Sequence, residues 1–163
     1  MHTTESSFAE ALGVGAVAGV VGGLGEIAWI ALYGAATGAQ TGPVARGIVS
    51  SVIPGLAASS WSPWLGILIH LGLAIALGLS LALMVRPLAR RGGARHFESG
   101  LVMFALAAVW VVNFFAVLPL INPGFIHLLP YGVTLLSKLL FGLSAATVFR
   151  AYRMRQLQVP HGG

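Results

Sequence analysis

The sequence of 163 residues contains no cysteine, no aspartate and a single lysine. Without cysteine the chain has no disulfide, no thiolate metal ligand and no thiol nucleophile. Only 8% of its residues are charged, whereas an average soluble domain has about 25%. Hydrophobic residues make up 57%, and the mean hydropathy is +0.90. This balance argues against a soluble fold and indicates a protein that resides in a lipid bilayer.

The net charge of +5 does not indicate nucleic-acid binding. The arginines cluster at the ends of apolar runs and form no basic stripe interleaved with exposed aromatic residues. The first ten residues, MHTTESSFAE, contain two glutamates and neither lysine nor arginine. A secretory signal needs a basic start and a short apolar core. We therefore expect the first apolar run to remain in the protein.

Four apolar runs are long enough to matter, at about 11–34, 64–85, 99–121 and 131–149. Each approaches the roughly 20 residues that a helix needs to cross the hydrocarbon. Backbone polar groups find no water there, so such runs are expected to be helical. The predicted fold is therefore all-α: one membrane domain over 1–163, built as an integral membrane bundle of four transmembrane helices.

Arginine placement predicts the orientation of these helices. The segment RPLARRGGARH joins the second and third runs, and RAYRMRQ follows the fourth. Basic loops face the cytoplasm, which puts both termini on the cytoplasmic side. Between the first two runs, PVARGIVSSVIPG is too short to span and is expected to be an amphipathic or re-entrant segment. Trp61, Trp64 and Tyr131 fit an aromatic belt at the outer interface.

One strongly polar residue falls inside each run: Glu26, His70, Asn113 and Lys138. Each lies about six to eight residues from the expected outer end of its helix. At about 1.5 Å per residue, this is a depth of roughly 9–12 Å for all four. The sequence therefore predicts a polar layer that crosses the bundle at one level.

The direction in which these side chains face supports the layer. Glu26 shares a helical stripe with three glycines, Gly15, Gly19 and Gly22. Small residues at this spacing let helices pack closely, so Glu26 should face other helices. Since a lysine or aspartate at the bilayer centre costs about 2.5–3.5 kcal/mol, we expect Glu26 to pair with Lys138. His70 and Asn113 would be hydrogen-bonding neighbours.

Other chemistry finds less support in the sequence. A b-type haem needs two histidines that face one another across helices, and His70 with His127 is the candidate pair. No Glu-x-x-His spacing suggests a metal site, and neither a metal nor another cofactor is expected. No nucleophile–base–acid set is visible, so the chain is not expected to be an enzyme. The run GVGAVAGVVGGLG lies inside a span, where its glycines serve helix packing rather than nucleotide binding.

The order of motifs GEIAWIALYG, IHLGLAIALGL, VVNFFAVLPLINPGF and KLLFGLSAATVFR resembles a loose group of small four-helix bacterial inner-membrane proteins. Most of that group is uncharacterised, and some members carry the label sodium:proline symporter. The chain is also distantly similar to the YagU-type inner-membrane proteins. Members tend to have a histidine where this chain has Lys138. Known sodium-coupled symporters use inverted repeats with broken helices, which four short spans do not supply. The resemblance therefore implies a fold and a bacterial inner (cytoplasmic) membrane, not an activity.

Taken together, these features predict a small accessory or structural membrane subunit. It would pack in the lipid bilayer against other membrane protein subunits or as a homo-oligomer, with the polar layer fixing helix register. The alternative is a small transporter, in which Glu26, His70, Asn113 and Lys138 form a proton, ion or ligand path. A haem-bearing electron-transfer subunit of a respiratory complex is the further alternative.

Overall fold

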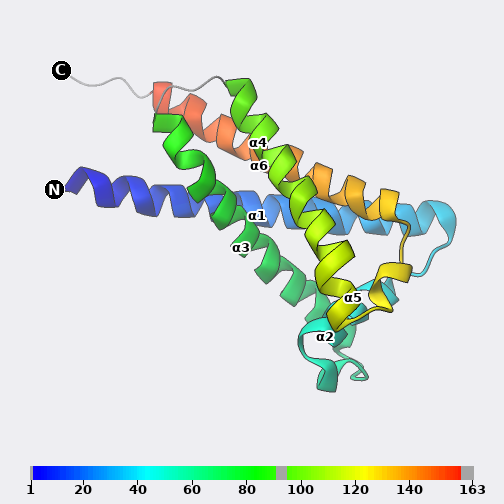
Figure 1. The fold of residues 1–163 in the computed structure, drawn as a ribbon. Coiled ribbons are helices and arrows are strands. Elements are labelled where there is room, and N and C mark those ends of the chain that lie inside the picture. The colour runs from blue at the N-terminus through cyan, green and yellow to red at the C-terminus, as the bar shows by residue number, and fades with distance from the viewer. Residues whose placement is uncertain (1, 91–94, 159–163) are drawn as a thin grey trace.

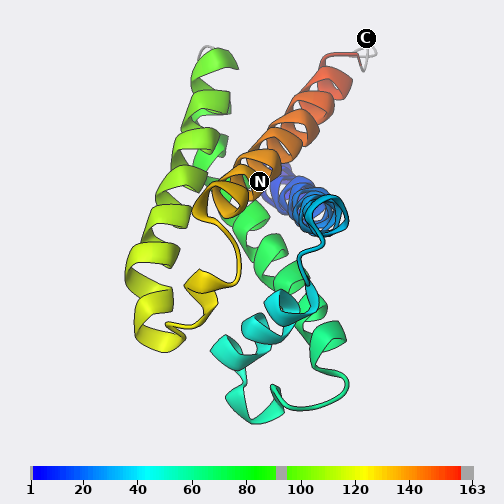
Figure 2. The same cartoon turned by 90° about the vertical axis from the view of Figure 1, so that its right-hand side faces the viewer.

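The computed structural model describes residues 2–90 and 95–158, and the backbone in these ranges is helical with no strand. Four long helices dominate (Figures 1 and 2): α1 (His2–Thr37), α3 (Ser62–Arg90), α4 (Arg95–Val112) and α6 (Tyr131–Gln158). Five short elements connect them: α2 (Gly42–Val52), η1 (Pro54–Leu56), η2 (Asn113–Val117), α5 (Leu118–Ile121) and η3 (Phe125–His127). The predicted all-α class is confirmed.

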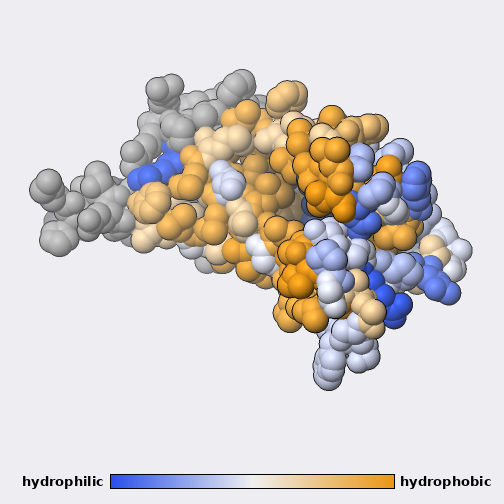
Figure 3. All heavy atoms as spheres, turned by 60° about the horizontal axis from the view of Figure 1, so that its bottom comes forward, coloured by the Kyte–Doolittle hydropathy of each residue, from blue (hydrophilic) through white to orange (hydrophobic). Residues whose placement is uncertain are grey.

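Four stretches are long and apolar enough to cross a membrane: Phe8–Thr37, Ser62–Arg86, Ser99–Ile121 and Tyr131–Tyr152. The third runs from α4 through η2 into α5. Figure 3 shows apolar side chains over the middle of one face, while hydrophilic side chains gather at the end that carries α2. These helices indicate a multi-pass membrane protein, as the sequence predicted.

The helices extend beyond their predicted ends. α1 begins at His2 rather than near residue 11, and α6 continues to Gln158 rather than ending at 149. The segment RAYRMRQ, expected as a loop, is therefore helical. Hydropathy marks where a helix leaves the hydrocarbon, but backbone hydrogen bonding can continue in water. Arginine, methionine and glutamine are good helix formers, which favours the extension of α6.

α1 is the hub of the bundle, because it packs against both α3 and α6. α4 packs mainly on α6, whereas α3 and α6 scarcely touch each other. The start of α1 and the end of α6 lie at the same end of the molecule as the end of α3 and the start of α4 (Figure 1). α2, α5 and η3 lie at the opposite end, which is called the α2 end below.

Glycine makes these contacts close. A Cβ added at Gly78 of α3 would overlap the backbone of Gly15 and Gly19 in α1. Gly22 of α1 lies under the ring of Phe141 of α6, which is fully buried. The predicted packing role of the α1 glycines is thus present, and it brings backbones together as in other membrane helix pairs.

At the α2 end, the segment expected to be amphipathic or re-entrant forms the 11-residue helix α2. It packs on the start of α3, where a Cβ at Gly66 would overlap the backbone of Ala45. Val49 of α2 and Ser62 of α3 are fully buried. α2 is therefore a packed part of the fold rather than a loose connection.

The third span is interrupted by a π-helical turn, η2, which the sequence analysis did not predict. The backbone N–H of Leu118 donates to the carbonyl of Asn113, five residues back. Pro119 follows, and it has no N–H to continue the ladder and would clash with a carbonyl one turn earlier. A wider turn before proline relieves this clash. Beside it, the rings of Trp110 and Phe114 stack on each other, and both meet the ring of Tyr131 edge to face.

A matched pair of glycines tests this packing. Gly78→Ala places a methyl group against the α1 backbone, and such overpacking costs about 1–3 kcal/mol. Gly13 of α1 is exposed and has nothing within 4 Å of an added Cβ. Gly13→Ala should be neutral or stabilising by up to about 1 kcal/mol, because alanine favours helix. Thermal unfolding in detergent should show a lower midpoint for Gly78→Ala only; equal midpoints would contradict the close α1–α3 contact.

Candidate functional site

Glu26 stands near the middle of the α1 span and is 3% exposed. Its glycine-rich face points at α3 and α6, as the stripe of small residues predicted. Because the neighbouring glycines offer no side chains, the carboxylate is within reach of groups on both helices. Among the described residues, the polar partners of the Glu26 carboxylate come from α3 and α6.

The predicted contact between Glu26 and Lys138 is present, with Nζ 2.7 Å from Oε1. Ser137 donates a hydrogen bond from Oγ to the same oxygen at 3.3 Å. Two consecutive residues of α6 thus approach one carboxylate oxygen. The Lys138 ammonium also lies 5.7 Å from the centre of the Phe141 ring, a cation–π distance. Sequence reasoning missed Ser137 in this role, because a serine in an apolar helix does not by itself indicate a carboxylate partner on another helix.

His70 of α3 completes the cluster from the other side. Its Nε2 lies 3.5 Å from Oε2 of Glu26, longer than a good hydrogen bond. Neither atom has a hydrogen-bond partner within the described part of the chain. The His70 ring also interacts with the backbone of Gly23. Glu26 is therefore held unevenly: Oε1 binds Lys138 and Ser137, and Oε2 faces His70 across a gap.

The cluster is closed around the acid and more open around the bases. The Glu26 side chain is 4% exposed, but those of Lys138 and His70 are 20% and 21% exposed. A buried carboxylate needs compensation, which the lysine supplies. The partly open bases could exchange protons or contact a neighbouring molecule. The arrangement can therefore hold α1, α3 and α6 together, and it also contains the ionisable groups that a proton relay needs.

The structure brings together three of the four residues predicted for the polar layer. Asn113 is half-buried at the start of η2, and among the described residues it makes no hydrogen bond to the cluster. The reason is the position of its helix: α4 packs on α6 and scarcely touches α1. Trp110 contributes to the contact between α4 and α6 by donating a hydrogen bond from Nε1 to Oγ1 of Thr134 at 3.0 Å.

The candidate haem ligands lie in different surroundings. His127 ends η3 and is exposed, whereas the Nε2 of His70 faces the Glu26 carboxylate. Within residues 2–90 and 95–158, no group of three or more His, Asp or Glu side chains is arranged to hold a metal ion. The geometry therefore adds no support for the haem alternative.

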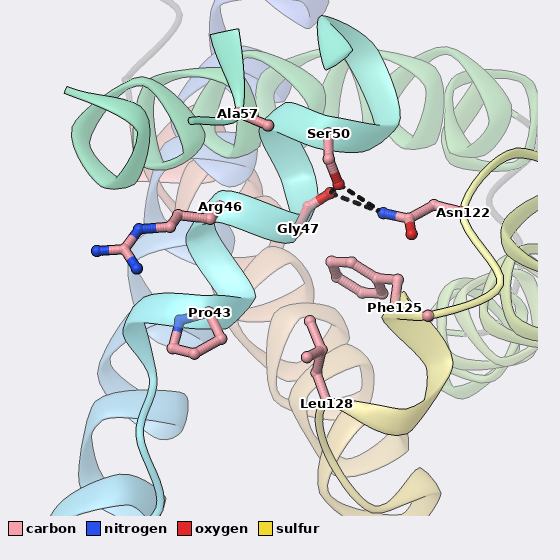
Figure 4. Close-up of a pocket in the computed structure, with 9 residues that line it drawn as sticks. Pro43, Arg46, Gly47, Ser50, Ala57, Asn122, Phe125 and Leu128 are labelled. Carbon is pink, nitrogen blue, oxygen red and sulfur yellow. Dashed lines mark hydrogen bonds between the residues drawn. The ribbon is translucent and has the colours of Figure 1, made fainter. Parts of the chain in front are cut away.

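A second polar group, which the sequence analysis missed, lies at the α2 end. The side-chain Nδ2 of Asn122 lies 2.8 Å and 3.0 Å from the hydroxyls of Ser50 and Ser51, and 3.2 Å from the carbonyl of Gly47. Figure 4 shows how this amide joins the end of the third span to α2 beside a cavity of about 300 Å³. An asparagine before proline indicates only a turn, and the partners of Asn122 are some 70 residues away in the chain.

Comparison with known protein families, curated proteins and solved structures finds no match to this chain. The resemblance to small four-helix inner-membrane proteins stays a prediction. The function must therefore follow from the chain's own residues.

The Glu26–Lys138 contact is testable by a double-mutant cycle. Glu26→Gln and Lys138→Met each leave one buried charge without its partner, which costs about 3–5 kcal/mol. The double substitution removes both charges and should be less damaging than either single change. Unfolding in mixed detergent micelles gives the three free energies. A double variant as unstable as the sum of the two single variants would show that the pair makes no energetic contribution.

Proposed function

We propose that this protein is a small membrane subunit that packs against a further membrane-spanning helix, in a partner protein or in a second copy. One observation supports this most directly. α3 carries a row of small residues on its exposed side, called the α3 notch: Gly72, Ala76 and Ser80. Large exposed residues, Leu68 and Leu83, bound it at either end.

The notch repeats a pattern that the same helix already uses. On the opposite side of α3, Ala74, Gly78 and Ala82 are buried, and α1 packs directly on them. Rows of small residues spaced by four allow a second helix to approach closely in lipid. No described residue covers the notch: all three of its residues are exposed, and a Cβ at Gly72 would meet no atom within 4 Å. A helix from another chain would fit there as α1 fits the other side.

The polar cluster has a structural role in this proposal. It ties α1 to α3 and α6 and so fixes the register in which α3 presents its notch. The proposed setting is a bacterial inner membrane with both termini in the cytoplasm. The positive-inside rule supports this orientation, because among the described residues every arginine but Arg46 lies toward the end of the molecule opposite α2.

Two exposed alanines provide the test. Ala76→Leu fills the notch, whereas Ala108→Leu adds the same side chain to an exposed site on α4 flanked by Phe104 and Val112. Overpacking of about 1–3 kcal/mol predicts a loss of association of about 5–150-fold for Ala76→Leu. The readout is the native mass and the co-purifying chains of protein extracted in mild detergent.

The Ala108→Leu variant should keep the mass and the co-purifying chains of the unmodified protein. Since the chain has no cysteine, Ala76→Cys would carry its only thiol, and a photoactivatable group attached to that thiol should cross-link to the neighbour in membranes. Association that survives Ala76→Leu unchanged would count against a partner helix in the notch.

A proton pathway is the second candidate function, and the gap between Glu26 and His70 favours it. Both facing atoms lack a hydrogen-bond partner within the described residues, and His70 is partly accessible. Buried ionisable groups of this kind mark proton relays in many membrane proteins. This candidate gives Glu26 the role of proton acceptor and His70 that of its exchange partner.

This second function predicts proton flux in liposomes loaded with a pH-sensitive dye. Flux should be present in the unmodified protein and fall to the level of empty liposomes in Glu26→Gln. Asn113→Ala is the matched control, because Asn113 is a polar residue of a span that lies outside the cluster. Flux that is absent from the unmodified protein, or retained in Glu26→Gln, would reject the pathway.

A further inference from the structure

The cavity at the α2 end has the composition of a binding site for an amphipathic molecule. Its volume of about 300 Å³ is at the lower end of the roughly 300–1,000 Å³ of small-molecule pockets. Apolar walls come from four residues: Pro43, Ala57, Phe125 and Leu128. Figure 4 shows Pro43, Phe125 and Leu128 below Gly47 of α2, and Ala57 above it.

The neutral polar groups of the cavity are already engaged with one another. The Asn122 amide contacts Ser50 and Gly47, and the Ser50 hydroxyl donates to the carbonyl of Gly47 at 3.0 Å. These groups hold the cavity open between α2 and the α5–α6 connection. They leave little hydrogen-bonding capacity for a ligand, so an occupant would contact mainly apolar surface.

Arg46 is the exception, because it stands at the rim without a counter-charge. It is exposed, and within the described residues it forms no ion pair. The sequence has no acidic residue between Glu26 and Glu98 and none after Glu98. Glu26 is already paired with Lys138 inside the bundle. Figure 4 shows the Arg46 side chain extending outward from the cavity, so its guanidinium could bind an anion at the mouth.

The level of Arg46 along the bundle indicates where the anion comes from. α2 packs on the first turns of the second span, which begins at Ser62, and its partner Asn122 follows the last residue of the third span, Ile121. Trp61 and Trp64 at this level are 73% and 66% exposed, as is usual for tryptophans at the membrane interface. Lipid phosphates occupy that zone.

We propose that the cavity and Arg46 together bind one anionic phospholipid. The phosphate would lie at the guanidinium, which forms charge-assisted hydrogen bonds with phosphate oxygens. The glycerol and the first part of an acyl chain would fill the space walled by Phe125 and Leu128. This site does not depend on the proposed partner helix, because it lies on α2 and the α5–α6 connection rather than on the α3 notch.

Native mass spectrometry of the full chain, titrated with phosphatidylglycerol, tests the site. Loss of one charge-assisted contact predicts affinity about tenfold weaker for Arg46→Gln. Arg46→Lys should retain most of it. Ala57→Phe should weaken binding by filling the cavity while leaving the charge in place. The matched control, Arg150→Gln, removes an exposed arginine from the opposite end and should bind as the unmodified protein does.

Several outcomes would overturn the proposal. Equal affinity of Arg46→Gln and the unmodified protein would exclude Arg46, and unchanged affinity of Ala57→Phe would exclude the cavity. An equal loss in Arg150→Gln would show general attraction of anionic lipid to a basic protein. Displacement of the lipid by inorganic phosphate would identify a soluble anion as the ligand. The Ala76→Leu variant should still bind phosphatidylglycerol, which separates this site from the proposed packing surface.

Discussion

The burial of the Glu26 carboxylate is the constraint on which the rest of the bundle depends. An ionised carboxylate in the middle of a membrane span is tolerated only with a partner and hydrogen bonds. Lys138 and Ser137 supply both from α6, and His70 approaches from α3. Because α3 and α6 scarcely touch each other, α1 holds them in a common arrangement by packing on both, and the Glu26 carboxylate contacts polar groups of both.

The Glu26 side chain can contact groups on both α3 and α6 only where those helices lie close to α1. Charge-assisted bonds need about 2.7–2.9 Å between nitrogen and oxygen. The glycine rows permit this distance, since Gly15 and Gly19 accept the backbone of α3 and Gly22 accepts the ring of Phe141. The glycines and the ion pair therefore act together. The small residues allow the helices to lie close, and the charged pair specifies the register in which the helices pack.

The outside of the molecule carries two features that internal packing does not explain. The α3 notch presents small residues where lipid contact alone would not require them. At the α2 end, Arg46 stands beside an apolar cavity without an acidic neighbour. The described residues neither cover the notch nor neutralise Arg46, which is why we propose another helix and a lipid as their partners. They lie on different elements and therefore stand independently.

Much of this protein was determined by sequence alone, because the bilayer restricts what a chain can do. Long apolar runs with at most one charged residue are expected to be helices, and a lone acid and a lone lysine at one depth in such runs have strong reason to pair. The helical spacing of the glycines on α1 was enough to predict that Glu26 faces other helices. These inferences need only distances along one helix.

Tertiary structure decided what depends on distances between helices. Depth placed Asn113 level with Glu26, but depth does not reveal that α4 sits against α6 and away from α1. Ser137 joined the cluster because the carboxylate reaches two consecutive residues of α6. Only the folded structure reveals the hydrogen bonds between Asn122 and α2, and hence the cavity beside them. Sequence sets the depth and facing of each side chain, and only helix packing decides which of them meet.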